Sequence, residues 1–182
     1  STYAIRARPA AIVVVTSGIS PNGTTLFTDI QGGAQESTGF EAEFFLAPVR
    51  GLELYASLGT CDAIYTEHPT NPALDGAHLV AAPERVASAW AKYVVARRGD
   101  RQVTLTAGVN HVGSMAYVGN NPLAILPAYT TVDLGVGCAF RAWDRAWTVD
   151  VLVKNVANER YYVSNSSWGF PRHAIATIST RF

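Results

Sequence analysis

Residues Arg160–Phe182, RYYVSNSSWGFPRHAIATISTRF, decide the fold class. After Pro171 the side chains alternate, with a more apolar set from Ala174 to Phe182 and a more polar set from His173 to Arg181. A period of two predicts a β-strand, because successive side chains of a strand point to opposite faces. The terminal aromatic residue suits a strand that ends at a bilayer surface, where membrane barrels carry aromatic girdles. An edge strand of a soluble sandwich would alternate in the same way, so this stretch alone leaves that alternative open.

The composition is unusual in its low charge. Only 15% of the 182 residues are charged, against about 25% in an average soluble domain. The 14 basic and 14 acidic residues give no net charge, so no field attracts nucleic acid or an anionic surface. The sequence has no run of about 18 apolar residues that could cross a bilayer as a helix. If the chain spans a membrane, it must do so as a β-barrel.

Alternation of the same kind recurs along the chain between clusters of turn residues. It predicts about eight antiparallel strands and no convincing helix, hence an all-β, antiparallel transmembrane β-barrel. The predicted strands cover 4–17, 24–48 with an interruption at Gly32-Gly33, 52 to about 64, 83–96, 103–117, 129–141, 147–154 and 172–182.

The connections alternate in length. Short turns are predicted at residues 49–50, 98–99 and 143–144, and longer links at 65–82, 118–127 and 158–170. Successive connections of an antiparallel barrel lie at opposite ends. Short turns at one end and long loops at the other are typical of bacterial outer-membrane barrels, whose short turns face the periplasm.

Charges avoid the apolar rows of the predicted strands. A Lys or Arg on the lipid face at mid-bilayer costs about 2 to 4 kcal/mol. The residues that keep to the opposite face are Glu41, Glu43, Glu53, Asp133, Asp150 and Lys154. Aromatic residues gather near both ends of the predicted strands, as two bilayer interfaces would require. A soluble lipocalin-like barrel would alternate too, with its faces inverted, but would not need two aromatic belts.

Four runs of the sequence, residues 37–65, 74–93, 129–140 and 147–182, resemble in this order the C-terminal part of TonB-dependent outer-membrane receptors. The most specific features are Asn155, Glu159-Arg160-Tyr161-Tyr162, Gly169-Phe170-Pro171-Arg172 and the terminal Arg181-Phe182. Within that family the chain is most similar to ferric-siderophore receptors. The resemblance covers about residues 24 to 182.

The resemblance implies a barrel of about 22 strands whose lumen is filled by an N-terminal plug. It implies a multi-pass protein of the bacterial outer membrane that imports a ferric siderophore, or a similar metal chelate, with energy delivered by TonB. Further implied partners are the outer-membrane assembly machinery and the lipid bilayer. The sequence departs from this pattern because it contains no plug and no TonB box. We therefore expect residues 1–182 to be the C-terminal portion of the barrel domain, either a fragment of a longer polypeptide or a degenerate remnant.

No catalytic constellation emerges, and an enzyme is not expected. Glu41 and Glu43 share one face of a predicted strand but lack a partner for acid–base chemistry. His68 and His78 lie in one loop with Glu67 and Asp75, yet their spacing matches no compact metal site. The resemblance implies no resident metal or cofactor either, because a siderophore carries its own iron.

Ligand recognition is expected from aromatic side chains near the long loops. The candidates are Trp168, Tyr65, Tyr117 and Tyr129, whereas Tyr161 and Tyr162 are more typical of an interfacial belt. Phe182, Ile178 and Thr180 on the terminal strand resemble the signal read by the outer-membrane assembly machinery. The identity of the ligand cannot be predicted from the sequence.

Two other function classes stay open. A free-standing eight-stranded outer-membrane barrel with a structural or adhesive role is geometrically feasible, and it predicts that the strand near Ala11–Thr16 pairs with the terminal strand. An outer-membrane hydrolase would need a Ser-His-acid set, which the sequence does not suggest.

Overall fold

The computed structural model describes residues 2–7, 11–19, 22, 25–68, 71–117, 124–164 and 166–181. Nearly all of this part of the chain consists of antiparallel β-strands, with one short 3-10 turn, η1 (Pro72–Leu74). The strands are β1 (Thr2–Ala7), β2 (Ala11–Ile19), β3 (Thr25–Gly32), β4 (Ala34–Val49), β5 (Leu52–Glu67), β6 (Arg85–Arg98), β7 (Arg101–Val112), β8 (Met115–Ala116), β9 (Ile125–Leu126), β10 (Tyr129–Ala142), β11 (Arg145–Lys154), β12 (Tyr162–Ser164), β13 (Ser167–Trp168) and β14 (His173–Arg181). No helix in the described part of the chain is both long and apolar enough to cross a membrane.

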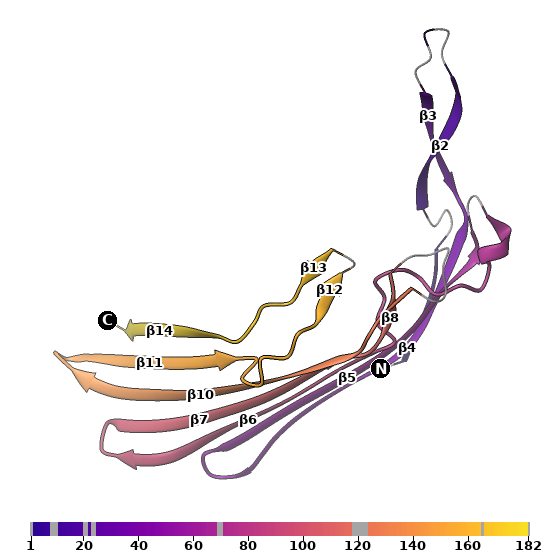
Figure 1. Ribbon diagram of the computed structural model, residues 1–182. Helices are drawn as coiled ribbons and strands as arrows, with labels where there is room; N and C mark the ends of the chain where they lie inside the picture. The colour runs from indigo at the N-terminus through magenta and orange to yellow at the C-terminus, as the bar shows by residue number, and fades with distance from the viewer. Residues whose placement is uncertain are drawn as a thin grey trace. The chain divides into compact units, whose positions relative to one another are not determined.

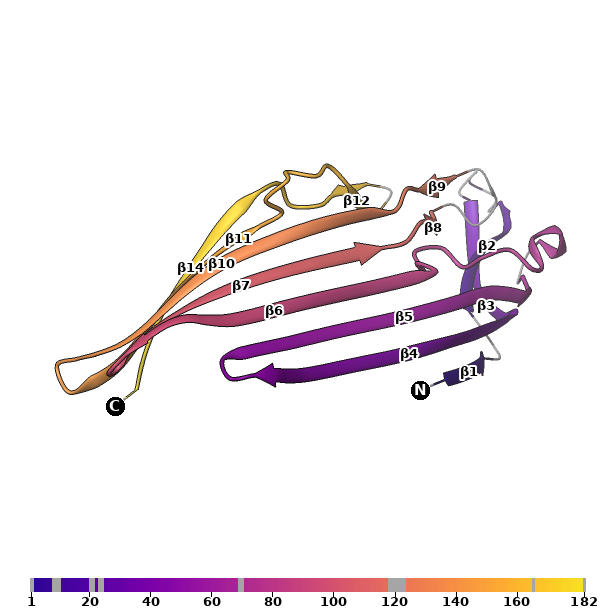
Figure 2. The same cartoon turned by 90° about the horizontal axis from the view of Figure 1, so that it is seen from below.

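Eight strands form one sheet in the order β1-β4-β5-β6-β7-β10-β11-β14 (Figures 1 and 2). The strands β1 and β14 are the two ends of this order, so the sheet does not close on itself within the described residues. Three two-stranded sheets, β2-β3, β8-β9 and β12-β13, belong to the connections. The observed strands confirm the predicted all-β antiparallel fold, and the open sheet is what a part of a barrel wall would have.

The chain divides into two compact units. The first comprises Ser1–Phe40, Thr60–Glu84 and Met115–Ile125. In it, β1 pairs with the start of β4, and β2 pairs with β3. Among its side chains whose burial the structure describes, the buried apolar ones are small or unbranched, namely Ala34, Ala63, Met115 and Ala124. Backbone hydrogen bonds such as Leu79 N to Ala63 O (2.8 Å) hold its loops against the strands.

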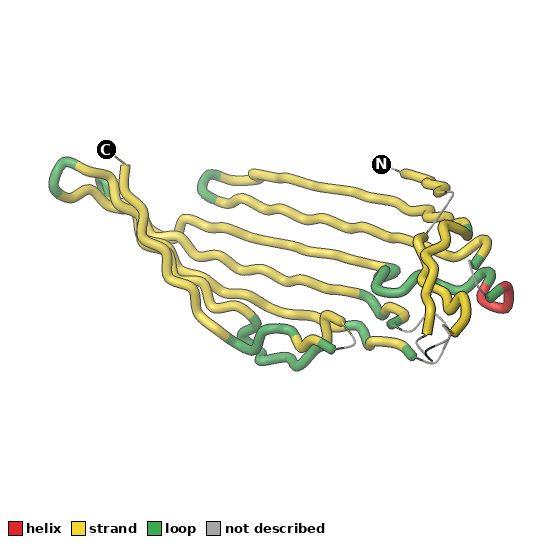
Figure 3. The backbone as a smooth tube through the Cα atoms, turned by 90° about the horizontal axis from the view of Figure 1, so that it is seen from above, coloured by secondary structure: helices red, strands yellow, loops and turns green. Residues whose placement is uncertain are grey.

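The second unit comprises Glu41–Gly59, Arg85–Ser114 and Leu126–Phe182. Here β6, β7, β10, β11 and β14 pair in sequence along most of their length. Figure 3 shows these long strands joined at one end by short turns. The β10–β11 turn has both central residues, Trp143 and Asp144, in the left-handed region, at φ 50° and 58°, the geometry that two-residue hairpins require.

In the second unit the apolar face of the sheet is exposed and the polar face is buried, the reverse of a soluble protein. In β10 the apolar Leu134 and Val136 are 49% and 47% exposed, whereas Thr131 is 8% and Asp133 1% exposed. In β7 Leu105 is 48% exposed and its polar neighbour Thr104 only 8%. A soluble domain buries its apolar face. The apolar face of this sheet is instead its open face, as in a strand with lipid outside and a polar lumen inside.

The N-terminal region corrects one predicted strand. The single strand expected over Ala4–Ser17 is two strands, because β1 ends at Ala7 and β2 begins at Ala11, and the two pair with different partners. Pro9 lies between them in the sequence, and proline cannot donate a ladder hydrogen bond. The interruption expected at Gly32-Gly33 is confirmed, with Gly33 at φ 82° between β3 and β4.

The pairing expected for a free-standing barrel is wrong. Ala11–Ile19 pairs with Thr25–Gly32 in a local hairpin, and the terminal strand β14 pairs with β11.

Candidate ligand site

A cavity of about 440 Å³ lies on the polar face of the second unit. Polar groups from neighbouring strands and aromatic rings from the loops that follow them form its lining. The lining residues are Asn110, Val112, Tyr129, Thr131, Asp133, Lys154, Asn155, Tyr161, Phe170, His173 and Ile175. Strand pairing explains why they meet, since Thr131 lies opposite Asn110 and Lys154 opposite His173.

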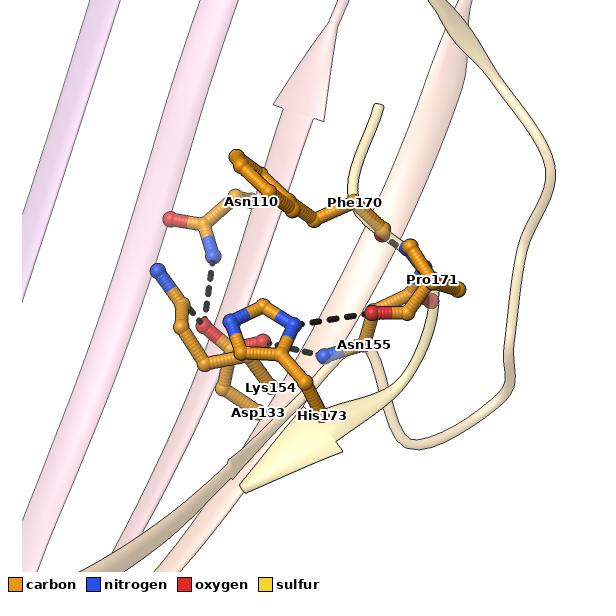
Figure 4. A network of polar contacts seen from close by, with 7 residues as sticks. All are labelled: Asn110, Asp133, Lys154, Asn155, Phe170, Pro171 and His173. Atoms are coloured by element: carbon orange, nitrogen blue, oxygen red, sulfur yellow. Dashed lines mark hydrogen bonds and ion pairs between the residues drawn. The ribbon is translucent and has the colours of Figure 1, made fainter. Parts of the chain in front are cut away.

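Asp133 is the centre of the polar lining (Figure 4). One carboxylate oxygen accepts a hydrogen bond from the backbone N–H of Asn155 at 2.8 Å. The other accepts a longer one from Asn110 Nδ2 at 3.4 Å and lies 3.8 Å from Lys154 Nζ. A buried carboxylate is tolerated only when it is paired in this way. Asp133 therefore fixes the end of β11 against β10.

Asn155 continues this network into the last loop. Its backbone has φ 52°, a left-handed conformation that asparagine adopts more readily than most residues. Its side-chain Nδ2 donates to Glu159 O at 2.9 Å and to Phe170 O at 3.2 Å, and its Oδ1 accepts from Glu159 N at 2.8 Å. Asn155 is 3% exposed. These bonds tie both ends of the last loop together.

A second asparagine, Asn158, supports the same loop. It also has a positive φ, 55°, and its Oδ1 accepts a hydrogen bond from Arg172 N at 3.0 Å. Asn155, Glu159 and Arg172, which belong to the most specific part of the resemblance, thus take part in anchoring the last loop.

Aromatic side chains form the rim of the cavity and the hairpin beyond it. Tyr129 and Tyr161 stack, with ring centroids 4.0 Å apart and an interplanar angle of 21°. The ring of Tyr161 also occupies the space that a side chain at Gly169 would need. In the β12–β13 hairpin, Tyr162 and Trp168 pair across the strands with ring centroids 3.9 Å apart. Trp168 is nevertheless 61% exposed, so its ring remains open to a ligand.

The arrangement is suited to binding and not to covalent catalysis. Its floor offers a half-exposed ammonium, the amide of Asn110 and the imidazole of His173, and its rim offers ring faces. Aromatic walls with a few placed polar groups are the usual lining of a small-molecule site. The Lys154 side chain is 42% exposed while that of its partner Asp133 is buried, so Lys154 can also meet an anionic group in the cavity.

The structure places the four predicted ligand residues in both units. Tyr129 and Trp168 belong to the second unit, and of these two only Tyr129 lines the cavity. Tyr65 and Tyr117 belong to the first unit, where Tyr65 packs edge-on against His68 and Tyr117 N bonds to Ala124 O. Tyr161, interpreted from the sequence as a belt residue, lines the cavity together with Tyr129.

The three residues of the predicted assembly signal are only partly covered by the structure. Ile178 is 67% exposed on the open face of β14. Thr180 pairs with Trp147 on the same face. Phe182 lies outside the described residues.

Sequence reasoning missed the Asp133 network as a site. It recognised that Asp133 and Lys154 avoid the apolar face, but not that they meet. The available signal was that both charges lie on the polar face near the same end of consecutive strands.

The two histidines of the long loop each contact a residue nearby in the sequence. His68 Nδ1 accepts from Asn71 N at 3.1 Å, and His78 Nδ1 lies 3.5 Å from Asp62 Oδ1. Among the residues that the structure describes, no group of three or more His, Cys, Asp or Glu side chains gathers to hold a metal.

Comparison with known families decides the identity of the fold. The family model described as TonB dependent receptor-like, beta-barrel matches residues 10–156, most of the chain. The chain belongs to this family. TonB-dependent receptor barrels lie in the bacterial outer membrane, so the exposed apolar face of this barrel wall contacts lipid and the cavity faces the lumen. The family consists of receptors and not of enzymes.

Solved TonB-dependent receptors have the same fold. BauA, the ferric preacinetobactin receptor from Acinetobacter baumannii, is 22% identical with a TM-score of 0.78 over 98% of this chain and 26% of that one. FyuA, the ferric yersiniabactin uptake receptor from Yersinia pestis, is 20% identical with a TM-score of 0.62, over 84% of this chain and 23% of FyuA. The ferripyoverdine receptor of Pseudomonas aeruginosa is 19% identical with a TM-score of 0.62, over 91% of this chain and 22% of that receptor.

This chain thus spans about a quarter of the length of those receptors. No curated protein matches it.

Proposed function

We propose that this chain is the C-terminal barrel portion of a receptor that imports ferric siderophores, or similar metal chelates, across the outer membrane. The observation that carries the proposal is the family match over residues 10–156, on a sheet whose polar face holds an aromatic-rimmed cavity. The similar solved structures named above are receptors for ferric preacinetobactin, ferric yersiniabactin and ferripyoverdine. Their ligands support a ferric chelate as the substrate class.

In this proposal the protein binds the chelate without coordinating its iron. Tyr129 and Trp168 of the second unit contact the organic part of the chelate by stacking. Tyr65 and Tyr117 are proposed as ligand residues of the first unit. Lys154 neutralises negative charge on the chelate. Transport requires a plug domain, through which TonB delivers energy, and the plug belongs to a part of the receptor outside these 182 residues.

The first test is the size of the intact protein. Peptides of this chain, including one that ends at Phe182, identify the polypeptide in native outer membranes, and intact-mass analysis then gives its size. A mass several times 19.5 kDa is expected. A mass near that of this chain would leave no plug to move and would overturn the transporter proposal.

The second test is uptake of iron. Cells that lack the receptor are complemented with the wild type, Tyr129→Ala or Trp168→Ala, and are supplied with radiolabelled iron as catecholate, hydroxamate or phenolate chelates. We expect at least one chelate class to be imported by the wild type and to be imported less by both variants. Trp143→Ala is the matched control, since Trp143 is an exposed aromatic residue (83%) at a short turn. Equal uptake with and without the wild-type receptor for every chelate would refute the proposal.

Assembly of the barrel is proposed to use Phe182, Ile178 and Thr180 as the signal on the terminal strand. Deleting Phe182 is expected to lower the amount of folded receptor in the outer membrane, measured by protease protection of whole cells. An unchanged amount would show that this residue is dispensable for assembly.

The free-standing barrel is a weaker alternative. It relied on pairing of Ala11–Thr16 with the terminal strand, whereas β2 pairs with β3. The hydrolase alternative receives no support from the family, whose members are receptors.

A further inference from the structure

An apolar groove of about 480 Å³ lies in the second unit, separate from the polar cavity. Its floor is formed by alanines of three neighbouring strands, Ala56, Ala89, Ala91 and Ala107, and larger side chains such as Phe44 border it. Ala89 and Ala91 lie opposite Val109 and Ala107, so the floor continues across strands. No charged residue lines the groove. The alanines and Phe44 lie on the lipid face by strand alternation, so a membrane component lies next to the groove.

Two arginines lie on the same face at the short turn below the groove. Arg98 and Arg101 are directly opposite each other, in the last pair of the β6–β7 ladder. Arg101 shares its face with Leu105 and Ala107, because these positions alternate along β7. The next pair of the ladder, Arg97 and Gln102, faces the other way, and Arg97 donates a hydrogen bond to the glutamine amide oxygen at 2.7 Å.

An irregularity in β6 puts Arg98 on the lipid face. The register shifts between Val94 and Ala96, and a bulge of one residue exchanges the two faces of the strand beyond it. Without the shift Arg98 would share the parity of Trp90 and face the lumen. Like charges directly opposite each other in a sheet are destabilising, so this pair calls for an anion between the two guanidinium groups.

The spacing between the arginine pair and the groove fits one lipid molecule. From Arg101 to Ala107 the strand extends about 20 Å, at ~3.4 Å per residue. With a tilt of about 40° this covers roughly 15 Å of depth, half of a hydrocarbon core of ~30 Å. Arg98 and Arg101 thus lie at headgroup depth when the alanine floor lies near mid-bilayer. Short turns face the periplasm in outer-membrane barrels, and that leaflet holds glycerophospholipids.

We propose that the groove and the arginine pair form a site for an anionic glycerophospholipid of the periplasmic leaflet. The phosphate binds between Arg98 and Arg101, and one acyl chain lies across Ala91 and Ala107. The site is independent of the chelate cavity, and it requires only that the chain is an outer-membrane barrel wall.

The test measures retained lipid on the intact receptor, extracted from outer membranes in a mild detergent. Native mass spectrometry follows the binding of phosphatidylglycerol with C16 chains, compared with phosphatidylcholine of the same chains and with lipid A. A basic residue near a membrane surface changes affinity for anionic lipid about fivefold. We therefore expect the double variant Arg98→Gln/Arg101→Gln to bind phosphatidylglycerol about 30-fold more weakly, and to lose less affinity for phosphatidylcholine, whose choline balances the phosphate charge.

Further variants separate the two halves of the site. Ala107→Phe fills the groove and is expected to weaken both glycerophospholipids, while Arg98→Lys/Arg101→Lys retains the charge and most of the binding. Arg145→Gln, at the β10–β11 turn, is the matched control and should bind like the wild type. The proposal is overturned if the wild type prefers lipid A or phosphatidylcholine, or if the double glutamine variant binds like Arg145→Gln.

Discussion

Substitution of Asn155 tests the anchor of the last loop most directly. Its side chain makes three hydrogen bonds, two to Glu159 and one to Phe170. At about 1 kcal/mol for each bond, Asn155→Gly should lower the free energy of unfolding by about 3 kcal/mol. Asn155→Ala should lower the free energy of unfolding by about 1 kcal/mol more than Asn155→Gly does. Alanine pays roughly 1–2 kcal/mol for the left-handed backbone conformation, which exceeds the roughly 0.5–1 kcal/mol that glycine loses through its greater backbone entropy in the unfolded state.

Asn158 supplies the matched control for this prediction. It has nearly the same backbone conformation, φ 55° against 52°, but its Oδ1 accepts one hydrogen bond, from Arg172 N. Asn158→Gly should therefore cost only about 1 kcal/mol.

The assay is equilibrium unfolding of the intact receptor in phospholipid vesicles by guanidinium, followed by tryptophan fluorescence. The reasoning would be refuted if the two glycine variants lost the same stability, or if Asn155→Ala unfolded within about 0.5 kcal/mol of the wild type.

Two further pairs of variants test the two faces of the sheet in the same unfolding assay. A Cβ at Gly108 would lie 2.5 Å from the Trp90 ring, so Gly108→Ala should cost about 1–3 kcal/mol, and Trp90→Ala in the same molecule should remove most of that cost. A Cβ at Gly137 comes closest to the flexible carboxylate tip of Asp150 of β11 and meets Thr104 only at ordinary contact distance. Gly137→Ala should therefore cost less and is the control; equal losses would contradict the packing argument. Val136→Lys, on the lipid face, should cost about 2–4 kcal/mol, whereas Thr177→Lys, on the lumen face opposite an aspartate, should cost little. If the lumen variant were the more damaging of the two, the assignment of the faces would be wrong.

Much of the wall could be predicted from local patterns. The alternation of Leu134, Val136 and their polar neighbours defines both the strand and its two faces, because side-chain direction in a strand repeats every two residues regardless of what the strand pairs with. The short turns could be predicted as well, because each is recognisable from a few neighbouring residues.

The site was less predictable. Tyr129 was chosen for its position at a strand start, and it does line the cavity. Its stacking partner Tyr161 was assigned to the interfacial belt, because the sequence contains no information about which loop returns over which strand. The convergence of Asn110, Asp133 and Lys154 depends on the register of three strands.

The sequence by itself determined the strands of the barrel wall, the separation of its two faces and the alternation of short and long connections. These features depend on interactions within a few residues or on the two-residue period of side-chain direction along a strand. Tertiary structure alone decided that β2 pairs with β3, that Asn155 ties the last loop to Phe170, and that Arg98 faces lipid. The physical reason is that each of these depends on which backbone segments pair and in which register, and the two-residue period of a strand does not fix either. A single bulge in β6 exchanges the faces of the residues beyond it without any change in composition.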